Sequence, residues 1–178
     1  MAWQFAIDVG GTFTDCFSIS PEGKTRCIKV LSSGLYKGRV DSAVSATQIK
    51  DSRRLREPDN LWSGSKITLF PEGQLPRSAQ IVDSCGASGT LKFDQPITCL
   101  QDASREPVRY EISMGEPAPL VAIRHILGLS ISEKLPDLEL RLGTTRGTNA
   151  LLTRSGARTA LITTLGFKDT LTCLLYTS

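Results

Sequence analysis

The sequence has few of the features that mark membrane, disulfide-rich or metal-binding proteins. No apolar run reaches the roughly eighteen residues of a membrane-spanning helix. The five cysteines include no CxxC pair and there is a single histidine, His125, a pattern that disfavours a disulfide framework or a zinc site. The opening residues MAWQ lack the basic and apolar regions of a signal peptide. We therefore expect a cytoplasmic protein without a membrane partner, and we exclude His125 from the functional site.

Charge gives no sign of a nucleic-acid partner. The 178 residues carry 21 Lys and Arg against 18 Asp and Glu, a net charge of +3 spread along the chain. The one basic run, RRLR at residues 53–56, has no interleaved aromatic residues and is interpreted as a solvated face. With 40% hydrophobic residues, the chain can bury one sizeable core, with room for a minor lobe.

The most informative segment is residues 5–15, FAIDVGGTFTD. Residues 3–9 alternate between apolar and polar side chains, which predicts a strand that ends near Asp8. Gly10 and Gly11 permit positive φ and close approach to an anion, and Asp8 can hold a metal ion directly or through water. The alternative is a β-hairpin in which the two glycines form only a turn. The residues expected to contact phosphates are Gly10, Gly11, Thr12, Phe13 and Thr14.

A second segment also has a pattern that is typical of an anion-binding loop. Residues 138–142 alternate as a strand, a hydroxyl-rich loop follows at 143–145, and a helix is predicted over 149–154. A strand, loop and helix start in this order place backbone N–H groups and threonine hydroxyls at one edge of a sheet, where an anion can bind. The alternative is simple helix capping by a threonine, worth about 1 kcal/mol. The candidate residues are Thr144, Thr145 and Asn149.

The pattern between and after these segments is mostly β. Residues 3–9, 13–20 and 24–31 predict an antiparallel three-strand meander. A helix is expected after Pro117 and is ended by Gly128. Further short strands are predicted at 66–70, 79–84, 90–93, 109–112 and 159–164.

Residues 8–15 (DVGGTFTD) resemble the amino-terminal signature of the hydantoinase A/5-oxoprolinase family, and residues 141–154 (RLGTTRGTNALLTR) resemble its second block. The resemblance covers roughly residues 4–40 and 115–171. It implies an α/β fold of the ribonuclease-H-like, actin-like ATPase type, in which a mixed sheet opens with the antiparallel meander and carries a β-rich insertion. The expected domains are an ATPase subdomain at 1–39 and 116–172, the insertion at 40–115, and a non-native tail at 173–178, which resembles translated sequencing-adaptor material.

The resemblance also implies a function. Members of this family couple ATP hydrolysis to opening a cyclic amide, so ATP and Mg²⁺ are the expected cofactors and Asp8 is the expected catalytic and metal-binding residue. The expected partners are a small cyclic amide and either the missing carboxy-terminal half or a hydantoinase B-like subunit. Because the adenosine-binding part of such folds comes later in the chain, we expect this fragment to be inactive alone. The alternatives are an actin-like sugar or acid kinase, an ATP-dependent carboxylase subunit, and a non-catalytic fragment.

Overall fold

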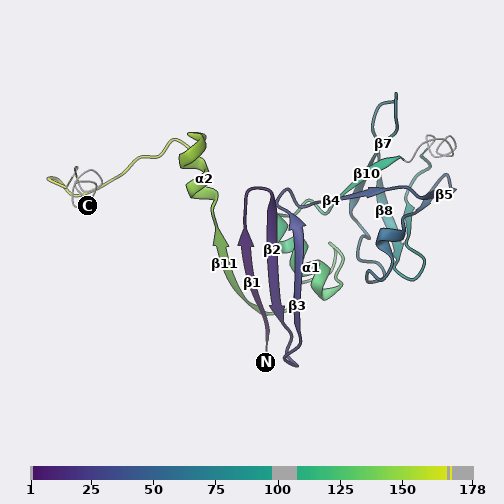
Figure 1. Cartoon of the computed structure of the whole chain (residues 1–178), viewed down its shortest axis with the longest axis horizontal. Helices are drawn as coiled ribbons and strands as arrows, with labels where there is room; N and C mark the ends of the chain where they lie inside the picture. Colours follow the sequence, from purple (N-terminus) through teal and green to yellow (C-terminus); the bar gives the residue numbers. More distant parts are fainter. Residues whose placement is uncertain (1, 98–107, 168, 170–178) are drawn as a thin grey trace. The chain divides into compact units, whose positions relative to one another are not determined.

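The computed structural model describes residues 2–97, 108–167 and 169, and these form a mixed α/β structure with two β-sheets (Figure 1). The chain forms two compact units, Met1–Arg146 and Gly147–Ser178. Both sheets belong to the first unit. Among the described helices, none combines the length and apolar character needed to cross a bilayer.

The first sheet has four strands in the order β11-β1-β2-β3. Its strands are β1 (Trp3–Val9), β2 (Phe13–Ile19), β3 (Thr25–Leu31) and β11 (Leu138–Thr144). β1, β2 and β3 pair antiparallel in chain order, and β11 pairs parallel with β1. The predicted meander and the mixed sheet are therefore confirmed.

Helix α1 (Ala118–Leu127) packs against one face of this sheet. Phe5 and Ile7 of β1 are buried in the core beneath the helix, whereas Asp8 is exposed, because successive strand residues point to opposite faces. The helix ends as predicted at Gly128, whose φ of 72° lies in the left-handed region that glycine adopts without strain. Helix α1 thus covers one face of the sheet, and the opposite face, which carries Asp8, is exposed.

The second sheet has seven strands in the order β4-β10-β7-β8-β9-β6-β5. Its strands are β4 (Leu35–Arg39), β5 (Ser42–Ser45), β6 (Gln48–Lys50), β7 (Lys66–Phe70), β8 (Arg77–Cys85), β9 (Thr90–Phe93) and β10 (Arg109–Ser113), and a 3₁₀ turn, η1 (Ser52–Arg54), follows β6. β7, β8, β9 and β10 were predicted, whereas β4, β5 and β6 were not. The boundaries at residues 39/40 and 115/116 stay a prediction.

Several local predictions are corrected. The basic run at 53–56 is not wholly solvated, because Arg54 is 6% exposed. Residues 159–164 form no strand: their side chains are exposed, and an extended segment needs a paired neighbour to satisfy its backbone groups. Helix α2 (Arg146–Thr153) begins earlier than the predicted 149, and the predicted loop at 143–145 is reduced to Thr145, because β11 continues to Thr144 through its pairing with Val9. The predicted tail at 173–178 lies outside the described residues.

Candidate functional site

Asp8 occupies the centre of a row of residues across three strands. It is paired with Asp15 of β2 on one side and with Gly143 of β11 on the other. A Cβ added at Gly143 would lie 3.7 Å from Asp8 Oδ1, so glycine keeps the space beside this carboxylate open. Asp15 Oδ1 is 2.9 Å from Lys29 Nζ, while no ion pair or hydrogen bond within the described residues engages the Asp8 carboxylate. Asp8 is therefore the carboxylate available to a cation.

The loop after β1 is a tight turn. The Gly10 N–H donates to the Phe13 carbonyl at 3.0 Å, and a Cβ added at Gly10 would lie 2.8 Å from that oxygen. Neither Gly10 nor Gly11 has a positive φ, which corrects the expectation for both, and at Gly10 it is close packing that requires glycine. The N–H groups of Gly11 and Thr12 have no acceptor in the described part of the chain. Two neighbouring free N–H groups on an exposed turn can both donate to one anion.

Thr14 has a different environment from the rest of the loop. Its side chain is fully buried, and its Oγ1 shares a 3.0 Å hydrogen bond with Ser32 Oγ. Ser32 Oγ in turn donates to the Gly10 carbonyl at 2.8 Å. The Thr14 hydroxyl thus ties the loop to the segment after β3, while its predicted phosphate contact stays a prediction. Thr12 and Phe13 are exposed at the turn.

The second motif lies beside the first at the same sheet edge. The Thr145 N–H and the Thr144 hydroxyl both donate to the Val9 carbonyl at 3.4 Å. Since β11 runs parallel to β1, the two strands bring the ends that carry these loops together. Asn149 lies on α2 in the second compact unit, so its assignment to this site stays a prediction.

A shallow pocket of about 510 Å³ lies around Asp8 on the exposed face of the first sheet. Besides Asp8 and Asp15 it is lined by Phe17, Cys27 and Arg141. The volume is in the range of small-molecule sites. Sequence reasoning missed Phe17 and Arg141, although each lies two residues along a strand from Asp15 or Gly143 and therefore shares their face.

A family model described as the hydantoinase/oxoprolinase N-terminal region matches residues 4–64 and 97–176. The chain belongs to this family. The match omits 65–96, the segment that contains β7, β8 and β9. The DVGGTFTD turn between β1 and β2 and the end of β11 at Gly143 and Thr144, which the structure places side by side, both fall within the matched residues.

The chain is also similar to individual proteins, among them two 5-oxoprolinases. A 5-oxoprolinase from Saccharomyces cerevisiae is 35% identical over 106 residues, which is 54% of this chain and 8% of the relative. A 5-oxoprolinase from Dictyostelium discoideum is 47% identical over 62 residues, 30% of this chain and 5% of the relative. An uncharacterised protein from Schizosaccharomyces pombe is 39% identical over 91 residues, 43% of this chain and 7% of the relative. The matches thus span less than a tenth of each relative, and no solved structure matches the chain.

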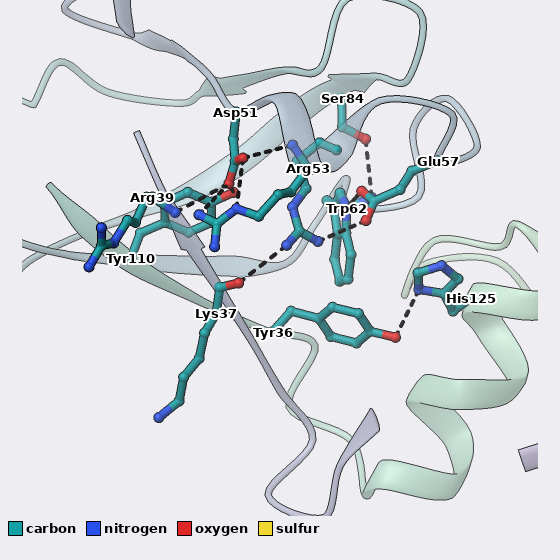
Figure 2. Close-up of polar contacts among 11 residues, drawn as sticks. Tyr36, Lys37, Arg39, Asp51, Arg53, Glu57, Trp62, Ser84, Tyr110 and His125 are labelled. Carbon is teal, nitrogen blue, oxygen red and sulfur yellow. Dashed lines mark hydrogen bonds and ion pairs between the residues drawn. The ribbon is translucent and has the colours of Figure 1, made fainter. Parts of the chain in front are cut away.

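His125, which sequence reasoning kept out of the site, belongs to the contact between the two cores. Its Nδ1 is hydrogen-bonded to the Tyr36 hydroxyl at 2.8 Å, and its ring stacks on that of Tyr36 (Figure 2). Tyr36 packs against the hydrophobic clusters of both sheets. Burial, together with the positive charges of Arg54 and Arg26, lowers the pKa of His125 from 6.5 to about 4. The imidazole is therefore neutral in the folded protein at pH 7.

This neutral histidine predicts a pH-dependent stability. The unfolded chain takes up a proton on His125 near its ordinary pKa of 6.5, whereas the folded chain does so only near 4. Stability should therefore fall as pH decreases through this window, by about 1–2 kcal/mol between pH 7 and 5. Urea unfolding of wild type and His125→Gln at both pH values measures the effect. We expect the variant to lose less stability than wild type over this range, and parallel losses would contradict the assignment.

Proposed function

We propose that this chain is the amino-terminal part of an ATP-dependent cyclic-amide hydrolase of the 5-oxoprolinase/hydantoinase type, with a ribonuclease-H-like, actin-like ATP-binding fold. The observation that carries the proposal is the register of the first sheet, in which Asp8 pairs with Gly143 and the two family motifs meet at one edge. Membership of the family and the 5-oxoprolinases among its relatives support the reaction class.

The residues at this edge fit a magnesium-bound nucleotide. Mg²⁺ at phosphate sites is usually held by one or two carboxylates together with phosphate oxygens and water. The described residues contain no group of three or more His, Cys, Asp or Glu side chains that could hold a metal ion, and the exposed carboxylate of Asp8, which has no ion pair or hydrogen bond within these residues, lines the pocket on the open face. Asp8 would hold the metal ion, and the N–H groups of Gly11 and Thr12 would donate to phosphate oxygens.

The chemistry that needs this site is activation of a lactam. The oxygen of a cyclic amide is a poor leaving group until it is phosphorylated, and a bound Mg²⁺ would neutralise charge on the transferring phosphoryl group. The chain's own contribution would be to position that group with the turn at 10–12. Because the Asp8 face is open to water, where charge interactions are weak, binding by this chain alone is expected to be weak and turnover absent.

Asp8→Asn should weaken binding of magnesium–ATP by at least about tenfold, because an amide cannot replace the charge of the carboxylate. Isothermal titration of the 178-residue chain with magnesium–ATP measures this, and the same titration without Mg²⁺ shows whether the metal is required. The matched control is Asp83→Asn, which removes an exposed carboxylate from β8 in the other sheet. Equal affinities of wild type and Asp8→Asn for magnesium–ATP would show that Asp8 does not take part in binding.

The reaction classes can be distinguished by assaying the products of a longer protein that carries this region. With 5-oxoproline or a hydantoin, we expect release of inorganic phosphate and the ring-opened product. A stable phosphorylated acceptor would instead indicate a kinase, and a carboxylated product would indicate a carboxylase. ATP hydrolysis by the 178-residue chain that disappears in Asp8→Asn would show that the fragment has a complete active site.

A further inference from the structure

A second pocket, of about 310 Å³, lies on the seven-stranded sheet at β4 and β10. Its lining is strongly cationic. The positively charged residues around it are Lys37, Arg39, Arg53 and Arg109, and the remaining side chains include Phe70, Tyr110 and Glu111. No sequence motif pointed to this pocket, because its residues come from segments far apart in the chain.

The strand register places two arginines directly opposite each other. Arg109 of β10 pairs with Arg39 of β4 on one side and with Phe70 of β7 on the other. Like charges in directly opposed positions destabilise a sheet. Within the described residues, neither guanidinium has a carboxylate partner, since Glu111 pairs with Lys37 at 3.4 Å. The sheet therefore carries an uncompensated pair of positive charges beside a pocket.

The nearest buried acid does not neutralise this pair. The Asp51 side chain is fully buried and accepts hydrogen bonds from the Tyr110 hydroxyl at 2.7 Å, from Arg53 Nε at 3.1 Å, and from the backbone N–H groups of Arg53 and Arg39 at 2.9 and 3.2 Å (Figure 2). The Asp51 carboxylate is thus occupied by these four donors, and none of them is the guanidinium of Arg39 or Arg109. Glycine at position 38 is required as well, because a Cβ there would lie 2.0 Å from Tyr110 Cζ.

We propose that this pocket binds a small organic anion through a phosphate or carboxylate group held by Arg39 and Arg109. Planar guanidinium groups match the geometry of both oxyanions, and an anion between them would relieve the repulsion across the strand pair. The ring of Phe70, opposite Arg109, offers an apolar surface to the body of the ligand. The site lies on a different sheet from Asp8 and stands independently of the proposed nucleotide site.

The test compares two variants of equal charge change. Arg39→Gln/Arg109→Gln removes the opposed pair, and Arg77→Gln/Lys92→Gln removes two exposed cations from β8 and β9 that do not line the pocket. Each chain is titrated calorimetrically at low ionic strength with inorganic phosphate and, separately, with succinate. We expect wild type to bind at least one probe and the first variant to bind it at least about tenfold more weakly, with the second variant close to wild type.

Thermal unfolding distinguishes this role from a structural one. Without ligand, Arg39→Gln/Arg109→Gln should melt at the wild-type temperature or higher, because it removes a repulsion. The probe that binds more tightly identifies the oxyanion as phosphate or carboxylate. Equal weakening in both double variants would show an effect of net charge alone, and no binding of either probe by wild type would remove the site. Either result would overturn the proposal.

Discussion

Glu57→Ala is expected to lower the free energy of unfolding by about 3–5 kcal/mol, because it leaves a buried charge without its partner. The side chains of Arg54 and Glu57 are 7% and 12% exposed, and Arg54 Nη1 lies 2.8 Å from Glu57 Oε1. Glu57 Oε2 also accepts a 2.6 Å hydrogen bond from the Trp62 indole (Figure 2). Alanine at position 57 would therefore remove the carboxylate partner of the Arg54 guanidinium, which would keep only its 3.3 Å hydrogen bond to the Lys37 carbonyl, and would remove the acceptor of the Trp62 indole N–H.

Urea unfolding measures this loss, and two further variants interpret it. Glu72→Ala removes an exposed glutamate from a turn and should change stability little. The double variant Arg54→Met/Glu57→Leu should regain most of the loss, because apolar residues can replace a buried ion pair without leaving a charge behind. A loss below about 1 kcal/mol for Glu57→Ala would place the pair in the range of solvent-exposed ion pairs.

Gly86→Ala is the second change with a large expected effect. A Cβ at position 86 would lie 1.7 Å from the Glu57 carbonyl oxygen and 2.8 Å from its carbon, so the backbone itself must shift. That backbone is held on both sides: the Gly86 N–H donates to Asp59 Oδ1 at 2.8 Å, and its carbonyl accepts from the Arg56 N–H at 2.9 Å. We expect a loss of roughly 3 kcal/mol.

The matched control for this glycine is Gly147→Ala. No atom lies within 4 Å of a Cβ added at Gly147, which is exposed on α2. Alanine there should be neutral or stabilise the helix by up to about 1 kcal/mol. If Gly86→Ala unfolded at the same urea concentration as wild type, the turn would be able to shift, and the close approach of position 86 to the Glu57 carbonyl would not affect the free energy of unfolding.

The sequence alone determined the elements whose side chains repeat with a clear period. The alternation in residues 3–9 and 13–20, together with Gly128 after an apolar helical stripe, predicted β1, β2 and the end of α1, because these signals are local. The motif DVGGTFTD predicted both the family and the turn in which Gly10 lies. In each case the information is contained within a few neighbouring residues.

Tertiary structure decided what depends on partners distant in sequence. The pairing of Asp8 with Gly143, which unites the two motifs, is a matter of register between strands more than a hundred residues apart. β5 has four exposed residues and forms because β6 pairs with it, whereas residues 159–164 have the pattern of a strand but no partner in the described part of the chain. Arg54 is buried because Glu57 and Trp62 surround it. Hydrogen-bonding and charge partners, more than local propensity, settle such positions, since unpaired polar groups are costly to bury.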